Sequence, residues 1–374
     1  MMEDLAYLPA WYGESEDYVL TDKTEPQLET FQNQLSTTLA LSFPVPISRE
    51  HLQKNKTELP PCEAHAWGLS PQAVAYFRNL RQEHLQIPEW NDIYRKLTGR
   101  QTAAHCLQLM KEALPSMKFP DLPHFCTSLA EVEAFLNQHR GQTCLLKSPF
   151  SSSGRGLLWL PNGQVGKKET DWTRGVIEKQ GAISLEVALD KRLDCAMEFY
   201  ADGNGSICYE GLSVFGTGER GTYSGNRLGS DDYRKQFLQT FIPAEAETII
   251  RENLQECLRK IFATHYKGYL GVDMLVYQDS NGQYRLHPCV EINMRYTMGM
   301  VALQLSRHFL APGATGLFRI EYEKETGKAL ALHRKMKTEQ PLILTNRKIE
   351  SGYLSLCPVS EKTHYRAFIE IQPA

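Results

Sequence analysis

Two strand-like stretches rich in apolar residues, 270–277 and 284–293, flank the dipeptide Asn281-Gly282. An Asn-Gly pair between two such stretches is the strongest short-range signal for a β-hairpin. A hairpin fixes which side chains lie opposite each other, because directly paired residues share a face of the sheet. This hairpin therefore constrains the fold more than any other feature of the sequence.

The second strand of the hairpin carries polar side chains on one face. Alternation places Glu291, Asn293 and, if the extended conformation continues, Arg295 together, while Val290 and Ile292 point into a core. Carboxylate and amide oxygens are hard ligands that suit Mg²⁺, which also keeps several waters and binds substrate phosphates. The pattern therefore indicates a metal and phosphate site, although an ordinary solvated strand face has the same composition.

Asp273 on the first strand lies between two apolar residues, so it also projects away from an apolar face. With a two-residue turn, Asp273 would face away from Glu291. A three-residue loop, Ser280-Asn281-Gly282 with a left-handed glycine, places Asp273 opposite Cys289 and diagonal to Glu291, about 7–8 Å away. A magnesium site on this hairpin therefore requires the three-residue loop or a bulge.

A second polar segment follows a short apolar strand predicted at 143–146. Residues 147–156, KSPFSSSGRG, place a lysine at the strand end before a run of three serines and two glycines. The backbone N–H groups and hydroxyls of such a loop can bind phosphate oxygens. The spacing fits neither a Walker loop nor a dinucleotide-binding fingerprint, so this segment alone is a weak signal.

Length, charge and cysteine usage narrow the class of protein. The chain has 374 residues, which predicts two or three domains, and 41 basic against 44 acidic residues give a net charge of −3. This balance gives no reason to expect a nucleic-acid partner. Nine cysteines without a C-x-x-C pair indicate reduced thiols rather than disulfides or a zinc site. Without a secretory or membrane-spanning pattern, we expect a cytoplasmic protein with no membrane partner.

Periodicity and capping signals predict the remaining elements. Predicted helices lie at 70–85, 100–114, 128–141, 246–265 and 298–310. Predicted strands lie at 5–8, at several places between 176 and 215, and at 341–345, 352–357 and 365–371, where the last three could close a sheet.

Taken in order along the chain, these features resemble the ATP-grasp superfamily over about residues 97–300. They are Arg100 opening a helix, Lys147 before a small-residue loop, a strand at 176–179, Asp273, and finally Glu291-Ile292-Asn293-Met294-Arg295. This sequence departs from the usual pattern in having arginine at position 100, aspartate at position 273 and a closing loop poorer in glycine.

The resemblance implies a role for each matching residue. Lys147 would meet the ATP phosphates, together with Arg100, and a loop would close over the triphosphate. The strand ending at Glu178 and Lys179 would be the hinge that contacts adenine. The loop residues are Ser151, Ser152, Ser153, Gly154, Arg155 and Gly156. The resemblance assigns two magnesium ions, with Mn²⁺ as an alternative, to Asp273, Glu291 and Asn293. It places Lys147 and Arg295 at the catalytic centre, with Arg295 facing the transferred phosphoryl group or the acyl phosphate.

The resemblance also implies a fold. We expect an α/β protein with the α+β ATP-grasp fold, in which two α+β subdomains clasp ATP after an N-terminal α/β pre-grasp domain. The expected boundaries are 1–96 for the N-terminal domain, 97–310 for the ATP-grasp domain with its lid at about 120–180, and 311–374 for a strand-rich extension.

Several of these residues fit a second interpretation equally well or nearly so. Arg100 fits a charge on a helix surface as well as a phosphate ligand. Glu178 and Lys179 fit a surface ion pair, and Arg155 fits a solvated loop cation.

The segment 215–232 holds five glycines together with Asn226 and Arg227. This composition fits a substrate or phosphate loop, and a plain surface loop is the alternative. His287 and Cys289 share the predicted face of Glu291 and are expected to line the site at most.

The function implied by the resemblance is that of an ATP-dependent, ADP-forming ligase. It would activate a small-molecule carboxylate as an acyl phosphate, which an amine then attacks in the manner of an amino-acid or peptide ligase. A phosphotransferase, a thiol ligase and a non-catalytic nucleotide-binding protein remain alternatives, and the assembly, for which a homodimer is one option, stays open.

Overall fold

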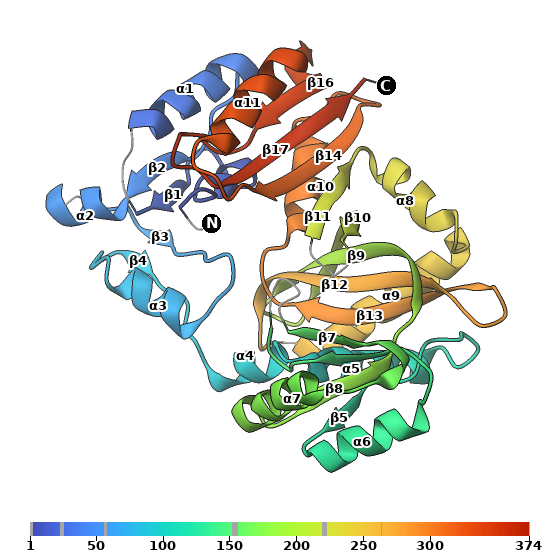
Figure 1. The fold of residues 1–374 in the computed structure, drawn as a ribbon. Coiled ribbons are helices and arrows are strands. Elements are labelled where there is room, and N and C mark those ends of the chain that lie inside the picture. The colour runs from blue at the N-terminus through green and yellow to red at the C-terminus, as the bar shows by residue number, and fades with distance from the viewer. Residues whose placement is uncertain are drawn as a thin grey trace. The chain divides into compact units, whose positions relative to one another are not determined.

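The chain folds into two compact units, which Figure 1 shows as a ribbon. The computed structural model describes residues 3–22, 26–55, 58–151, 156–218, 223–262 and 264–373. Unit 1 combines 1–90, 224–234 and 295–374, and unit 2 combines 91–223 and 235–294. Each unit has a hydrophobic core of its own, and a third core lies inside unit 2.

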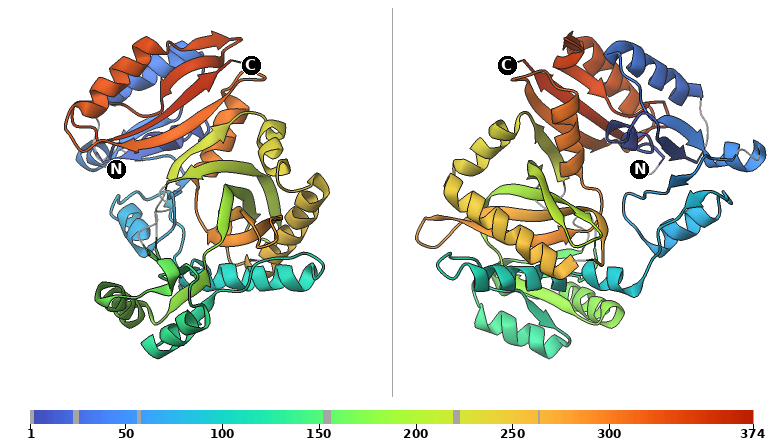
Figure 2. Two further views of the ribbon diagram at one scale, coloured as in Figure 1. Left: turned by 45° about the vertical axis from the view of Figure 1, so that its right-hand side comes forward. Right: turned by 180° about the vertical axis from the view of Figure 1, so that it is seen from behind.

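Four antiparallel strands form the larger sheet of unit 2, in the order β13-β12-β9-β10. They are β9 (Asp190–Asp202), β10 (Ile207–Thr217), β12 (Lys267–Gln278) and β13 (Tyr284–Asn293). Two helices, α5 (Arg100–Ala113) and α9 (Ala244–Phe262), share a core with this sheet. Figure 2, right, shows α9 lying across the sheet. Helix α9 confirms the helix predicted at 246–265, and its residues Ile250, Leu254 and Leu258 are buried at helical spacing.

A smaller antiparallel sheet of unit 2 has the order β5-β8-β6-β7. Its strands are β5 (His124–Cys126), β6 (Cys144–Lys147), β7 (Leu157–Leu160) and β8 (Ile183–Val187). Two helices, α6 (Leu129–Gln138) and α7 (Lys167–Gln180), cover it and share its core. Ser128 caps α6 by accepting from the N–H of Glu131, as the capping signal predicts. The short helices η2 (Pro161–Gly163) and α4 (Asp92–Leu97) complete the unit.

The strand predicted at 176–179 is wrong, because these residues form the last turns of helix α7. Two β-branched residues in a row suggested a strand. The longer pattern decides otherwise, since Trp172, Val176 and Ile177 recur at helical spacing and pack in one core. Gly181 then ends the helix with a left-handed backbone (φ 82°). The strand of this region is β8, which starts seven residues further along the chain.

The N-terminal part of unit 1 is a β-α-β arrangement. Strands β1 (Tyr18–Thr21) and β2 (Val45–Ser48) are parallel and are connected through helix α1 (Pro26–Leu39). The strand predicted at 5–8 is instead a turn leading into the short helix η1 (Leu8–Trp11). The rest of this part comprises α2 (Arg49–Asn55), β3 (Cys62–Glu63), α3 (Pro71–Arg78) and β4 (Leu85–Gln86), in which β3 and β4 are parallel.

The C-terminal part of unit 1 is an antiparallel sheet in the order β11-β14-β17-β16-β15. The strands are β11 (Tyr223–Leu228), β14 (Thr315–Tyr322), β15 (Ile343–Thr345), β16 (Lys348–Ser355) and β17 (Tyr365–Gln372). The three tail strands predicted from the sequence are therefore confirmed, while β14 was missed. Helices α8 (Asp231–Gln239), α10 (Met298–His308) and α11 (Lys328–Glu339) lie between these strands in the chain, and α11 was also missed.

All nine cysteines are free, and seven of them are buried. Among the residues that the structure describes, no helix is long and apolar enough to cross a membrane.

Candidate active site

The hairpin of β12 and β13 has the three-residue loop that the metal hypothesis requires. Asp279 and Gln283 close the loop through a backbone hydrogen bond of 2.8 Å. Gly282 at the end of the loop has φ 77°, a left-handed conformation that glycine adopts without strain. Asp279 also accepts from the N–H groups of Asn281 and Gln283, which holds the loop in place.

A bulge in the same hairpin then brings the two predicted carboxylates opposite each other. Asp273 pairs with Glu291 and Leu275 pairs with His287, so one residue of β12 faces three residues of β13, 288–290. Pro288 lies in this bulge, where a residue without an N–H group does not break the ladder. The predicted bulge is therefore confirmed. It pairs Asp273 directly with Glu291, so the two lie closer together than in the diagonal arrangement expected from the loop alone.

Directly paired residues of an antiparallel ladder share a face, with their Cβ atoms about 4.5–5.5 Å apart. Asp273 and Glu291 thus form a half-buried carboxylate pair, and Asn293 follows at the next position of the same alternation. No group of three His, Cys, Asp or Glu side chains suited to a metal ion occurs in the described part of the chain. A metal here would therefore need the carboxamide of Asn293 and its own waters, which is the oxygen-rich ligand set that Mg²⁺ accepts.

Arg100 is the first residue of α5 and connects this carboxylate pair to the smaller sheet. Its side chain is only 9% exposed. Its Nη1 donates to Glu291 at 3.3 Å, its Nε to the carbonyl of Ser148 at 3.0 Å and its Nη2 to Ser151 at 3.2 Å. The structure therefore decides between the two interpretations of Arg100 in part, because this arginine is not a charge on the helix surface.

Lys147 at the end of β6 is buried and forms an ion pair with Glu186 of β8, with 2.5 Å between Nζ and Oε1. Both residues line a cavity of about 10 Å³, as does the side chain of Arg100. His287 lines the same cavity. Burial, followed by the charges of Lys147 and Lys111, lowers the pKa of His287 to about 3, so its imidazole is neutral near pH 7. The cavity thus has a fixed positive charge at Lys147 and a neutral histidine beside it.

The loop after Lys147 is held at its base by contacts that leave no room for a larger residue. The N–H of Ser148 donates to the carbonyl of Gly156 at 2.9 Å. A Cβ atom at Gly156 would collide with the side chains of Ser148 and Ser151, so only glycine fits there. Gln180 at the end of α7 both donates to the carbonyl and accepts from the N–H of Phe150. The two ends of the loop are therefore fixed, and Ser152–Arg155 lie outside the described residues.

Known proteins resemble this chain in structure but not in sequence. No family model and no curated protein sequence matches it. The N5-carboxyaminoimidazole synthetase from Staphylococcus aureus is similar over 99% of this chain and 92% of its own, with a TM-score of 0.53 and 13% identity. A biotin carboxylase from Campylobacter jejuni, in a complex with β-γ-ATP, is similar over 99% and 85%, with a TM-score of 0.54 and 12% identity.

A third solved structure is the biotin carboxylase domain of 2-oxoglutarate carboxylase from Hydrogenobacter thermophilus, bound to MgADP, ADP and bicarbonate. It is similar over 95% of this chain and 76% of its own, with a TM-score of 0.52 and 13% identity. The chain has the ATP-grasp fold. The predicted α+β architecture is thereby confirmed: two α+β subdomains lie in unit 2, and an N-terminal α/β segment precedes them in the chain.

Within the ATP-grasp fold, the structure brings Arg100, Ser151, Asp273 and Glu291 into one connected site, with Lys147 in the same unit. Glu178 and Lys179 are exposed on α7, so their assignment as a hinge strand loses its structural basis. Val290 is only half-buried because the bulge interrupts the alternation, whereas Ile292 is buried as predicted.

Three further predicted residues belong to unit 1. Asn226 and Arg227 lie on strand β11, and Asn226 is fully buried opposite Phe318 of β14. The segment 215–232 is therefore not a loop throughout: most of its described residues are in β10, β11 and the start of α8. Arg295 packs against Gly68, where a Cβ would lie 3.2 Å from that of Arg295.

Sequence reasoning missed Glu186 and Ser148. Glu186 is marked by the alternating strand Ile183–Val187, which follows Gly181 and has the β-branched ends typical of a buried strand. Ser148 had no signal of its own, because its contribution to the site is a backbone carbonyl that any residue could offer.

Proposed function

We propose that this chain is an ATP-dependent, ADP-forming ligase that activates a small carboxylate as an acyl phosphate for attack by an amine. One observation supports it most: the bulge places Asp273 opposite Glu291, and Arg100 joins Glu291 to the base of a serine- and glycine-rich loop. The structural neighbours include a biotin carboxylase in a complex with β-γ-ATP and a carboxylase domain bound to MgADP and bicarbonate.

The nucleotide would lie between the two sheets of unit 2. Lys147 supplies a buried positive charge for the phosphates, and Arg100 holds the base of the loop from Ser151 to Gly156 that would cover them. We place the adenine-contacting hinge at the end of β8, close to Glu186, instead of at Glu178 and Lys179. This strand pairs with β6 on the side opposite β7, and the side chain of Glu186 reaches Lys147 through their ion pair.

Magnesium would be held by Asp273, Glu291 and Asn293, whose oxygens fit its preference for hard ligands. When bound, the metal would supply charge neutralisation for the phosphate oxygens. Two ions are compatible with this donor set, and Mn²⁺ accepts the same ligands. Arg295 follows Asn293 by two residues in the chain, and we assign it to the acyl phosphate.

The chemistry needs no protein nucleophile. A carboxylate oxygen attacks the γ-phosphorus of ATP, the bond between that phosphorus and the bridging oxygen breaks, and ADP leaves. The amine nitrogen then attacks the acyl carbon, the carbon–oxygen bond to phosphate breaks, and the amine proton passes to the released phosphate. Positioning and charge stabilisation by Lys147, Arg100 and Arg295 are what such a transfer requires. We expect the substrates to be small molecules of the cytoplasm.

Positional isotope exchange tests the acyl phosphate directly. ATP labelled with ¹⁸O at the βγ-bridge is incubated with the protein, Mg²⁺ and a mixture of amino acids or small carboxylates without an amine. Scrambling of the label into the β non-bridging positions indicates reversible acyl phosphate formation, and added amine should convert it into net ADP release and a coupled product. ADP release with one co-substrate and a stable phosphorylated product would instead identify a phosphotransferase. No exchange and no turnover with any mixture would overturn the proposal.

A further inference from the structure

Unit 1 contains a groove of about 300 Å³ between helices α1 and α11. Figures 1 and 2 show these two helices side by side. Gln27, Thr30, Phe31 and Gln34 line one wall at helical spacing, so a single face of α1 is turned toward the groove. His333 of α11 and Pro358 lie across from them. A groove of this size is at the small end of the range for small-molecule sites.

The wall formed by α1 has an unusual composition for a helix that faces another helix. Two carboxamides and a hydroxyl flank one aromatic ring, although helix pairs ordinarily close through apolar side chains. Phe31 packs edge-on against Tyr7, with 5.8 Å between ring centroids, so its ring is fixed as an apolar floor. The groove thus combines a rigid apolar surface with polar groups that can point into it.

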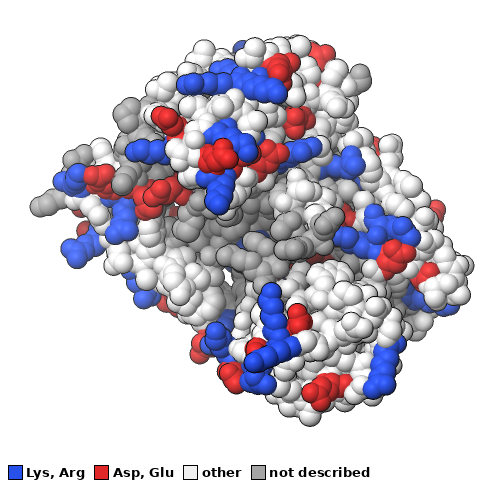
Figure 3. Space-filling view, viewed as in Figure 1, with Lys and Arg blue, Asp and Glu red and all other residues white. Residues whose placement is uncertain are grey.

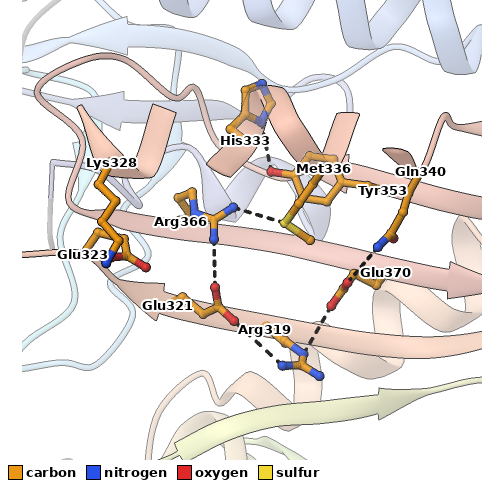
Figure 4. A network of polar contacts seen from close by, with 10 residues as sticks. All are labelled: Arg319, Glu321, Glu323, Lys328, His333, Met336, Gln340, Tyr353, Arg366 and Glu370. Atoms are coloured by element: carbon orange, nitrogen blue, oxygen red, sulfur yellow. Dashed lines mark hydrogen bonds and ion pairs between the residues drawn. The ribbon is translucent and has the colours of Figure 1, made fainter. Parts of the chain in front are cut away.

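His333 is held in position by a polar contact with Tyr353, which Figure 4 shows. Its Nδ1 lies 2.9 Å from the hydroxyl of Tyr353, and the other ring nitrogen points away from Tyr353. Behind them, Arg366 is fully buried and donates to Glu321 at 2.8 Å and to the sulfur of Met336 at 3.4 Å. The ring of His333, which lines the groove, is therefore anchored through Nδ1, and Nε2 is the nitrogen left for a ligand.

The charges around His333 are positive. Burial, followed by the charges of Lys337, Arg366 and Arg334, lowers the pKa of His333 to about 4. Glu321, a nearby carboxylate on β14, is paired with Arg366, and none of the described residues that line the groove is acidic. Helix α11 carries four basic residues against Glu339, and Figure 3 shows Lys and Arg side chains together with Asp and Glu side chains over this part of the molecule. The charges of Lys337 and Arg334 near His333, above a rigid apolar floor, favour an anion with an apolar body.

We propose that this groove is a second ligand site, which binds a small organic anion carrying an aromatic or aliphatic group. The anion's oxygens accept from Nε2 of His333 and from the carboxamides of Gln27 or Gln34, while its apolar part lies on Phe31 and Pro358. An anion beside the ring stabilises the imidazolium, so binding takes up a proton at His333. The site is independent of the ligase chemistry proposed above.

A pair of probes that differ in charge but hardly in shape tests the proposal. Benzenesulfonate is an anion at every pH used, and benzenesulfonamide is its neutral analogue. The full-length chain is labelled with ¹³C at histidine Cε1, and each histidine is titrated by NMR. With benzenesulfonate the titration midpoint of His333 should rise from about 4, and with benzenesulfonamide it should stay unchanged. No shift at His333 with benzenesulfonate would overturn the proposal.

Two pairs of variants separate the groove from a general effect. His333→Gln should weaken benzenesulfonate binding at least about tenfold, as expected for the loss of a charge-assisted hydrogen bond. His308→Gln makes the same change at an exposed histidine of α10 and should leave binding unchanged. Binding of equal strength by wild type and His333→Gln would contradict the assignment.

The second pair of variants tests the electrostatic effect of the lysines on α11 without changing a residue that lines the groove. Lys337→Gln should weaken benzenesulfonate binding and raise the titration midpoint of His333 in the free protein, because one of the cations that lower it is gone. Lys335→Gln on the same helix removes an exposed lysine next to Glu339 and should do neither. Equal effects of the two variants would show that basic residues attract benzenesulfonate nonspecifically, and would overturn the proposed ligand site.

Discussion

Arg100 in unit 2 has a largely buried side chain, Arg366 in unit 1 is fully buried, and each donates to a glutamate. The distances are 3.3 Å from Arg100 to Glu291 and 2.8 Å from Arg366 to Glu321. Arg100 stands at the start of a helix and uses its other donors on a loop carbonyl and a loop hydroxyl. Arg366 stands inside a strand, with its guanidinium 4.8 Å from the centre of the Phe368 ring. A buried ion pair therefore does not indicate function by itself; its remaining contacts do.

Replacing each glutamate by glutamine should separate the two arginines most clearly. Glu291→Gln keeps the acceptor for Arg100 but removes the charge beside Asp273. We expect ATP turnover to fall roughly 10²–10³-fold, which is typical for the loss of one preorganised electrostatic group. The free energy of unfolding should change by less than about 1 kcal/mol, because Glu291 is half-exposed. ADP release and urea unfolding measure the two effects.

Glu321→Gln is the matched control in unit 1. It should retain the turnover of wild type per folded molecule, because Glu321 pairs with Arg366 and Arg319, both in unit 1 and outside the proposed active site. Normal turnover by Glu291→Gln, or an equal loss in both variants, would sink the assignment of the active site to the hairpin.

The two regions also differ in what the sequence could reveal. Asp273, Glu291 and Asn293 follow from a period of two and a turn dipeptide, which are local rules, so their face could be predicted from the strand pattern. The direct pairing of Asp273 with Glu291 could not be predicted, because it depends on the number of residues in the bulge at Pro288. The sequence predicted that a metal site requires a three-residue loop or a bulge, and the structure has both.

Arg366 and helix α11 had no such local signal. Arg366 alternates with apolar residues on β17, and nothing in the chain near it indicates that its partner is Glu321, 45 residues earlier. Helix α7 was misread for a related reason, since a pair of β-branched residues outweighed a 14-residue pattern. The prediction was therefore limited by long-range pairing and by competition between local signals. The fold class, in contrast, could be predicted from the order of the motifs along the chain.

Arg366→Met should have the largest effect on stability. Methionine keeps much of the apolar volume but leaves Glu321 without its closest partner. We expect a loss of about 3 kcal/mol in the free energy of unfolding, at the low end for breaking a buried pair because Glu321 stays partly solvated. Urea unfolding followed by circular dichroism measures it. Arg78→Met, at an exposed position of α3, should stay within about 0.5 kcal/mol of wild type; a similar loss in both would contradict a structural role specific to Arg366.

His287 in unit 2 and His333 in unit 1 allow the same comparison as a function of pH. Burial and nearby cations lower the pKa of His287 to about 3 and that of His333 to about 4. Below the unfolded value near 6.5, the unfolded chain binds protons that the folded chain does not, so stability falls as the pH falls from about 6.5 toward the folded pKa. For the fully buried His287 we expect a loss of about 1 kcal/mol between pH 7 and 5.5.

His287→Gln should remove this part of the pH dependence, which urea unfolding at the two pH values measures. His333→Gln should remove a smaller part, because His333 is only half-buried and solvent screens it. His308→Gln, on the surface, should leave the slope as in wild type. If the free energy of unfolding depends on pH in the same way in wild type and all three variants, neither His287 nor His333 resists protonation in the folded state.

Two glycines of unit 2 give the most local test, because an added methyl group has opposite consequences at them. At Gly175, in the middle of α7, a Cβ meets nothing within 4 Å, so Gly175→Ala should stabilise the protein by about 1 kcal/mol through helix propensity. At Gly156 a Cβ collides with Ser148 and Ser151, so Gly156→Ala must open the base of the loop at a cost of about 1–3 kcal/mol. If the loop covers the ATP phosphates, Gly156→Ala should also raise the KM for ATP, whereas Gly175→Ala should leave it unchanged. If Gly156→Ala lowers the stability but leaves the KM for ATP unchanged, the loop has a structural role only. The loop would then not bind ATP together with Arg100.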